Sequence, residues 1–128
     1  MRFSSPEKIK VGVIGYGGAF NMGRSHLMEM QQAGMTPMAA CDLNPERLTV
    51  ARQDFPGLAT FTSVEDMLAK GDLDLVVIIT PHNTHAELAL TALRSGRHVV
   101  CEKPLAITTE ECDAMIREAR KQDVLLST

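Results

Sequence analysis

Apolar runs and amphipathic segments alternate along the chain, and this alternation constrains the fold more than any other feature. The run LVVIIT at 75–80 is apolar on both faces, as expected of a central parallel strand that helices cover on each side. Strands that alternate with helices predict right-handed βαβ units and an open parallel sheet. The expected fold class is therefore α/β, a doubly wound Rossmann-type domain. The expected strands are Ile9–Ile14, Pro37–Cys41, Ala59–Thr62, Leu75–Thr80, His98–Cys101 and Val124–Ser127.

The segments between these strands carry helix caps and core-facing stripes. Asn44 precedes a proline at the first helical position, Ser63 precedes a short helix, and Thr84 and Thr108 each open a capping-box pattern. A left-handed glycine is expected to end three helices, at Gly34, Gly71 and Gly96. Two stripes with helical spacing are expected to face the core: Ala86, Ala89, Leu90, Leu93, and Cys112, Met115, Ile116, Ala119.

Composition argues against several classes of function. The 128 residues are enough for one domain, and a net charge of −3 without a Lys/Arg cluster offers no surface for nucleic acid or anionic membranes. No apolar run approaches the about 20 residues that span a bilayer. The N-terminal MRFSSPEKIK lacks the apolar region of a signal peptide, so we expect a cytoplasmic protein. The three cysteines lack C-x-x-C spacing; two lie in apolar runs, where we expect small buried hydrophobes and no disulfides.

The stretch VGVIGYGGAFNMG, residues 11–23, places Gly15, Gly17 and Gly18 directly after the first strand. Such a turn lets backbone N–H groups and the start of the next helix approach a pyrophosphate. Position 20, where a third glycine is usual, holds Phe20, and we expect Gly23 to take over the close packing of helix and sheet after a loop lengthened within 19–22. A structural turn without a ligand is the alternative interpretation.

Asp42 closes the second predicted strand and strengthens the dinucleotide hypothesis. An acid at this place can accept hydrogen bonds from both hydroxyls of an adenosine ribose, and its charge would repel a 2′-phosphate. NAD is therefore favoured over NADP, although Arg47, one turn into the next helix, is able to meet a 2′-phosphate. A solvated turn residue or a helix cap is the alternative for Asp42.

Two further segments end strands at the edge where open α/β sheets bind ligands. Thr80-Pro81 delays the fourth helix and is followed by His82 and His85, either of which is able simply to cap or pack. The pair Glu102-Lys103 emerges directly from the fifth strand before Pro104. A lysine there can stabilise negative charge on a reacting oxygen, whereas an ordinary surface ion pair is the alternative.

At these residues the chain resembles the N-terminal domain of the Gfo/Idh/MocA oxidoreductases over essentially its whole length. The resemblance rests on GVIGYGG, CDLNPER, TPHNTHAELALTAL and HVVCEKPLA, of which the Glu-Lys-Pro motif with Thr-Pro and its downstream histidine is the most specific. It implies hydride transfer between NAD or NADP and a sugar or polyol hydroxyl carbon, with Lys103 as the catalytic lysine. The implied cofactor-binding residues are Gly15, Tyr16, Gly17, Gly18, Ala19, Phe20, Asp42, Leu43, Arg47, Thr80, Pro81, His82, His85, Glu102 and Lys103.

Members of this family are longer and carry a second domain that completes the substrate pocket. We therefore expect residues 1–128 to be a truncated or excised cofactor half, inactive alone, from a parent enzyme that is able to form homo-oligomers. Two other interpretations stay open at this point. A non-catalytic nucleotide-binding or dimerising module has no evident use for Lys103, and an S-adenosylmethionine-dependent transferase leaves Thr80-Pro81 and the Glu-Lys-Pro motif unexplained.

Overall fold

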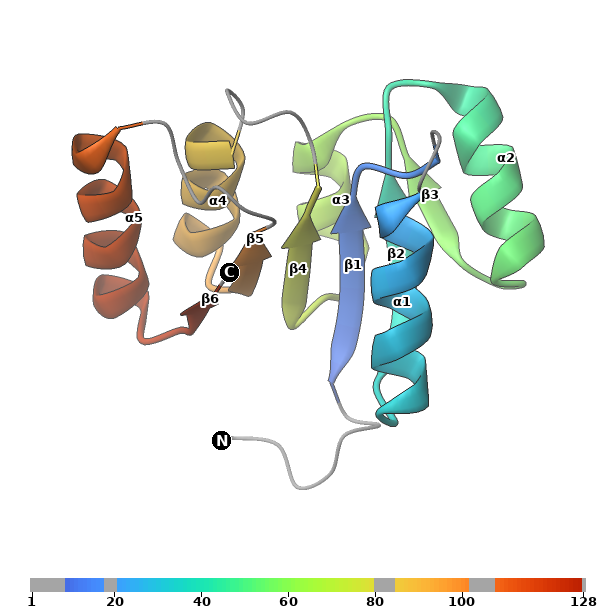
Figure 1. The fold of residues 1–128 in the computed structure, drawn as a ribbon, viewed down its shortest axis with the longest axis horizontal. Coiled ribbons are helices and arrows are strands. Elements are labelled where there is room, and N and C mark those ends of the chain that lie inside the picture. Colours follow the sequence, from blue (N-terminus) through green and yellow to red (C-terminus); the bar gives the residue numbers. More distant parts are fainter. Residues whose placement is uncertain (1–8, 18–20, 80–84, 102–107, 128) are drawn as a thin grey trace.

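The computed structural model describes residues 9–17, 21–79, 85–101 and 108–127. Within these ranges six strands form one sheet in the order β3-β2-β1-β4-β5-β6, and every neighbouring pair is parallel (Figure 1). The doubly wound α/β prediction is confirmed. The elements are β1 (Lys10–Ile14), α1 (Met22–Gln32), β2 (Thr36–Cys41), α2 (Pro45–Asp54), β3 (Ala59–Phe61), α3 (Val64–Lys70), β4 (Leu75–Ile78), α4 (His85–Arg94), β5 (His98–Cys101), α5 (Thr109–Gln122) and β6 (Leu126–Ser127).

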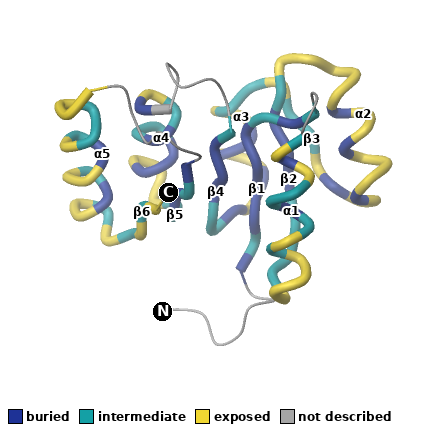
Figure 2. The backbone as a smooth tube through the Cα atoms, viewed as in Figure 1, coloured by how far each residue is buried: buried dark blue, intermediate teal, exposed yellow. Residues whose placement is uncertain are grey.

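Two apolar layers cover the sheet, one on each face. One layer joins Leu27 of α1 and Ala51 of α2 to strand residues such as Val13. The other joins Met67 of α3, the small residues of α4 and Met115 of α5 to the opposite sides of the strands. Figure 2 shows the strands buried between helices whose outer surfaces are exposed. Successive side chains of each strand point to opposite faces of the sheet and pack in the two layers in turn. Both faces are therefore apolar, which explains the continuous apolar runs in the sequence.

The strand order reverses between β1 and β4, because the connection through α3 carries the chain from β3 past β2 and β1. Ligands of open α/β sheets bind beyond the carboxyl ends of the strands at such a reversal. The turn after β1 and the ends of β2 and β4 therefore frame the expected binding site.

Helix ends mostly follow the predicted caps. Side chains of Asn44, Ser63 and Thr108 accept hydrogen bonds at the starts of α2, α3 and α5, and Thr108 forms a complete capping box with Glu111. Gly34 and Gly96 adopt the expected left-handed conformation.

Two local expectations were wrong. Gly71 ends α3 with φ −78°, and the left-handed residue is Asp72 with φ 52°. Gly71 is instead needed for space, because a Cβ there would press on the Met67 carbonyl and on Leu73. Ile116 does not belong to the core stripe of α5: it is 39% exposed, whereas Met115 is fully buried.

Candidate cofactor-binding site

The glycine turn begins directly at the end of β1. Gly15 has φ +103° and Gly17 has φ +84°, conformations that L side chains rarely adopt. The Gly15 N–H donates to the Cys41 carbonyl at 2.8 Å, and a Cβ on Gly15 would lie 3.3 Å from the backbone carbonyl of Ile79. The turn therefore lies between the ends of β2 and β4, and glycine is required there for both conformation and space.

Gly23 brings the start of α1 against this turn. A Cβ on Gly23 would overlap the Gly15 carbonyl oxygen and lie 3.1 Å from Cδ2 and 3.2 Å from Cα of Tyr16. The expected packing role of Gly23 is confirmed, and its partner is the backbone of the turn at the end of β1. Since no side chain separates them, the N–H groups of the first helical turn stay close to the glycine turn.

Asn21 caps α1 and was not among the predicted site residues. It adopts a left-handed conformation, with φ 38°, and its Oδ1 accepts from the Gly17 N–H at 2.8 Å and from the Arg24 N–H at 3.1 Å. One amide oxygen thus accepts from the turn and from the helix start together, much as an anion oxygen would. The preference of asparagine for N-cap positions is the signal that points to it.

Asp42 lies at the end of β2 with its side chain 12% exposed. Its Oδ2 accepts from the Tyr16 N–H at 3.0 Å, and its Oδ1 accepts from the Asn44 N–H at 2.9 Å. A carboxylate offers about four acceptor positions, so two N–H donors fix its orientation and leave roughly two positions for other donors. Asp42 is therefore both a support of the glycine turn and an available acceptor.

Arg47 reaches back from α2 over the turn. Its side-chain carbons pack where a Cβ on Gly17 would lie, at 2.9 Å, and its Nη1 is 4.0 Å from Asp42 Oδ2. The Arg47 side chain is about half exposed, so this long ion pair contributes little to stability and leaves the guanidinium able to turn toward another anion.

These residues surround one cleft of about 530 Å³, in the usual size range of small-molecule sites. Leu43 stands at its rim with 88% of its surface exposed, an unusual position for a leucine and a ready apolar contact for a flat ring. The lining is Ile14, Gly15, Tyr16, Gly17, Met22, Gly23, Cys41, Asp42, Leu43, Arg47, Thr62, Val64, Ile79, Glu87 and Leu88. The structure thus brings together every predicted cofactor residue of the first two strand ends that it describes.

The other predicted site residues lie outside the described ranges. These are Gly18, Ala19, Phe20, Thr80, Pro81, His82, Glu102 and Lys103, together with the capping-box position Thr84. His85 begins α4, but its side chain is not described. Their roles stay predictions.

Cys41 also lines the cleft, but its chemistry is not that of a nucleophile. Burial, followed by the negative charges of Asp42 and Glu65, raises the pKa of the Cys41 thiol to about 11. Burial alone raises the pKa of Cys101 to about 11 as well. Both thiols are free and buried, as expected, and remain protonated at neutral pH, which makes them poor nucleophiles and metal ligands.

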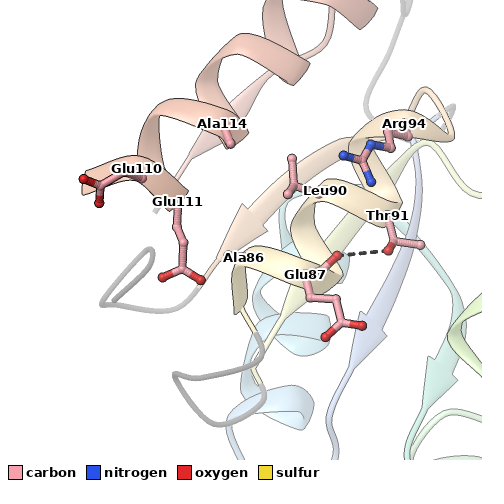
Figure 3. Close-up of a pocket in the computed structure, with 8 residues that line it drawn as sticks. All are labelled: Ala86, Glu87, Leu90, Thr91, Arg94, Glu110, Glu111 and Ala114. Atoms are coloured by element: carbon pink, nitrogen blue, oxygen red, sulfur yellow. Dashed lines mark hydrogen bonds between the residues drawn. The ribbon is translucent and has the colours of Figure 1, made fainter. Parts of the chain in front are cut away.

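A second cavity, of about 550 Å³, lies between α4 and α5 (Figure 3). Glu110 and Glu111 from the start of α5 and Glu87 from α4 give it an acidic lining, and Arg94 stands farther along α4. Glu111 already serves the capping box, and Arg94 pairs with Glu118 at 3.5 Å. Glu87 also lines the first cleft, so the two hollows adjoin at this residue.

Comparison with known proteins decides what class of protein carries this cleft. Residues 9–128 match the family described as "Oxidoreductase family, NAD-binding Rossmann fold", Gfo/Idh/MocA. The chain belongs to the Gfo/Idh/MocA family. It is an NAD-binding Rossmann domain of these oxidoreductases, and the resemblance carried by its sequence motifs is confirmed.

Individual Gfo/Idh/MocA relatives support this assignment. The chain is 38% identical over 108 residues, 84% of its length, to 1-carboxy-3-chloro-3,4-dihydroxycyclohexa-1,5-diene dehydrogenase of Comamonas testosteroni, of which it covers 26%. It is 29% identical to an NADP⁺-dependent scyllo-inositol 2-dehydrogenase of Bacillus subtilis, over 94% of the chain and 33% of the relative. The WlbA dehydrogenase of Bordetella pertussis, crystallised with NADH and UDP-GlcNAcA, superposes with a TM-score of 0.85 at 33% identity, over 94% of the chain and 36% of the dehydrogenase. The chain thus spans about a quarter to a third of these proteins.

None of the helices in the described part of the chain is both long and apolar enough to cross a membrane.

Proposed function

We propose that the chain is the cofactor half of an oxidoreductase that transfers hydride between NAD and the hydroxyl carbon of a sugar or polyol. The observation that carries this proposal is the single cleft shared by the glycine turn and the oriented Asp42 carboxylate. Membership of the Gfo/Idh/MocA family supports it, as do the inositol substrate in one relative's name and the nucleotide sugar bound to another.

The described residues fit a dinucleotide. Gly15 and Gly17 carry no Cβ in the turn, and Gly23 keeps the helix start beside it, so the positive end of the α1 dipole would lie close to a bound pyrophosphate. Asp42 would accept from the two ribose hydroxyls with its remaining acceptor positions, and exposed Leu43 would cover the adenine ring. The nicotinamide ring would supply the hydride or receive it.

Beyond the described residues, the proposal extends to the motifs after β4 and β5. Thr80, Pro81, His82 and His85 would line the nicotinamide half, and Glu102 would approach its ribose. Lys103 would hydrogen-bond the substrate oxygen beside the carbon that exchanges hydride, where a positive charge stabilises developing negative charge. We also propose that residues 1–128 are one domain of a longer enzyme whose second domain supplies the substrate pocket. The lengths of the relatives support this part of the proposal.

Asp42 should set the preference between the two nicotinamide cofactors. Its charge repels a 2′-phosphate, so the chain should bind NADH more tightly than NADPH, with NADPH still accepted through Arg47. We expect Asp42→Ala to weaken NADH binding by at least about 100-fold, since it removes two hydrogen bonds to a charged acceptor that contribute about 1.5–3 kcal/mol each.

Titration calorimetry with NADH and NADPH on the purified chain tests this proposal. Because Asp42→Ala also releases the Tyr16 and Asn44 N–H groups, loosening of the turn will weaken both cofactors. The ratio of the two dissociation constants is therefore the decisive quantity, and it should move toward NADPH. Glu46→Ala is the matched control, because this exposed acid at the start of α2 does not line the cleft. An unchanged ratio in Asp42→Ala would contradict the proposed role of the acid.

A further inference from the structure

Tyr16 belongs to the glycine turn, yet its ring lies in the core. Only 2% of the residue is exposed, and it packs in the layer that α1 and α2 form over the sheet. Its backbone N–H donates to Asp42, and its hydroxyl donates to Asp54 Oδ2 at 2.6 Å. One turn residue is thereby tied both to the acid at the end of β2 and to the far end of α2.

Asp54 and Arg24 occupy helix ends that disfavour their charges. Asp54 is the last residue of α2, next to the negative end of the helix dipole, and Arg24 lies in the first turn of α1, next to a positive end. Each misplacement costs about 0.3–1 kcal/mol. The two charges offset one another, because Arg24 Nε lies 3.5 Å from Asp54 Oδ2. The side chain of Asp54 is 25% exposed, so the pair holds a partly buried carboxylate in place beneath the Tyr16 hydroxyl.

We propose that the Tyr16–Asp54 hydrogen bond positions the nucleotide-binding turn, and that Tyr16 is a positioning residue for the cofactor. The anchored ring fixes the backbone between Gly15 and Gly17, and its N–H orients the Asp42 carboxylate. A turn ordered before binding loses less conformational freedom when the dinucleotide arrives, which raises affinity without a direct contact. This inference rests on the proposed NAD-binding function and adds a residue pair that touches no part of the reacting groups.

Tyr16→Phe is the first test, because it removes the hydroxyl and keeps the ring. We expect the dissociation constant for NADH to rise about 3- to 10-fold, the range of one ordinary to strong hydrogen bond. Asp54→Ala should give a similar loss. The double variant should bind no more weakly than either single variant, because both remove the same interaction. Thr60→Val is the matched control. It removes a hydroxyl that accepts at 2.6 Å from Arg52, which lies in α2 like Asp54, and neither Thr60 nor Arg52 lines the cleft. This variant should leave NADH affinity unchanged.

Stability alone does not explain such a result. Binding is measured at a temperature where circular dichroism shows every variant fully folded, so that unfolding does not reduce the apparent affinity. If the Tyr16–Asp54 bond were purely structural, the effects of Tyr16→Phe and Asp54→Ala on the free energy of unfolding would be coupled. Their effects on the dissociation constant for NADH would then be additive or absent. Only the positioning role predicts that the two variants have non-additive effects on the dissociation constant for NADH.

Tyr16 also carries its own spectroscopic signal. It is the one tyrosine of the chain, which has no tryptophan, so phenol absorption and emission report this site alone. The charged groups that face the hydroxyl are Asp54 and Arg24. Burial first, and then the Asp54 hydrogen bond and charge, raise the pKa of the phenol, whereas Arg24 lowers it. In Asp54→Ala the phenol should therefore ionise at lower pH than in the unmutated chain, which confirms that the bond exists in solution.

The two possible failures are distinguishable. If the unmutated chain does not bind NADH at saturating concentration, the proposed function is wrong, and the positioning role is refuted as well. If the unmutated chain binds NADH and Tyr16→Phe binds within about twofold of it, the proposed function stands and the positioning role is refuted.

Discussion

The closeness of α1 to the glycine turn gives a sharp prediction for Gly23→Ala. In an ordinary helix this change would stabilise the protein by up to about 1 kcal/mol. Here the new Cβ would overlap the Gly15 carbonyl oxygen and crowd Tyr16 Cα at 3.2 Å, and neither backbone atom can rotate away. Overpacking of this kind costs about 1–3 kcal/mol, so we expect a net loss of about 1–2 kcal/mol in the free energy of unfolding.

Moving α1 away from the turn should also weaken cofactor binding. The Gly17 and Arg24 N–H groups would no longer share the Asn21 Oδ1 acceptor that joins the turn to the helix start, and we expect the dissociation constant for NADH to rise at least about tenfold, or 1.4 kcal/mol. Urea unfolding followed by circular dichroism measures the first effect, and titration calorimetry measures the second.

Gly57→Ala is the matched control for this experiment. A Cβ on Gly57 would meet nothing within 4 Å, but φ is +90°, so alanine is strained by about 1–2 kcal/mol. This variant should lose comparable stability and keep its NADH affinity. If Gly23→Ala binds NADH as tightly as the unmutated chain, the close approach of α1 is not needed for binding and the reasoning fails.

Four further predictions concern reactivity and stability. In the folded chain a thiol reagent should modify Cys112, which is partly exposed, well before Cys41 and Cys101. Burial raises the pKa of the Cys41 and Cys101 thiols from the ordinary 9.0 to about 11, so the unfolded chain loses these protons first. Their contribution to the free energy of unfolding is complete below pH 9 and is lost as the pH rises toward about 11, which urea unfolding at stepped pH would detect. Arg97 donates to three backbone carbonyls at 2.7–3.1 Å, and Arg97→Lys should lower the free energy of unfolding by about 2 kcal/mol, because an ammonium cannot reach all three; an unchanged urea midpoint would contradict this. Thr108→Ala removes the hydroxyl that accepts from the Glu111 N–H, but keeps the backbone N–H that donates to Glu111 Oε1; it should cost about 1 kcal/mol, measured in the same way, with Thr108→Ser as the variant that retains both bonds.

Sequence patterns predicted the features of this fold that depend on neighbouring residues. The strand at His98–Cys101 was predicted with both ends correct, because its apolar run is bounded by a glycine turn and a proline motif. Most other strands were a residue or two longer in prediction, as Val124–Ser127 was against the observed Leu126–Ser127, whereas Pro37–Cys41 was one residue shorter than the observed Thr36–Cys41. The caps at Asn44 and Thr108 were found for the same local reason: the side chain bonds a backbone N–H only two or three residues ahead.

The site was predictable to the extent that it follows from strand ends. Gly15, Asp42 and Arg47 were expected to meet because parallel strands end at one edge, and the structure brings them to one cleft. The partnership of Tyr16 with Asp54 was not predictable, since it joins positions 38 residues apart through a contact between tertiary elements. Gly71 was misread for a different reason: a Cβ there would meet the Met67 carbonyl and Leu73, and the sequence does not distinguish a glycine needed for space from one needed for a left-handed backbone.

The central place of β1 has a consequence for how the chain is made. β1 pairs with β2 on one side and with β4 on the other, although it precedes both strands in the chain. Until β4 has been synthesised, one long edge of β1 has no hydrogen-bonding neighbour within the sheet, and an open apolar edge of this kind invites pairing with other nascent chains. The order of the strands thus leaves one edge of β1 open until α2, β3, α3 and β4 have been synthesised, and slow translation through residues 42–74 should increase aggregation more than slow translation after residue 101.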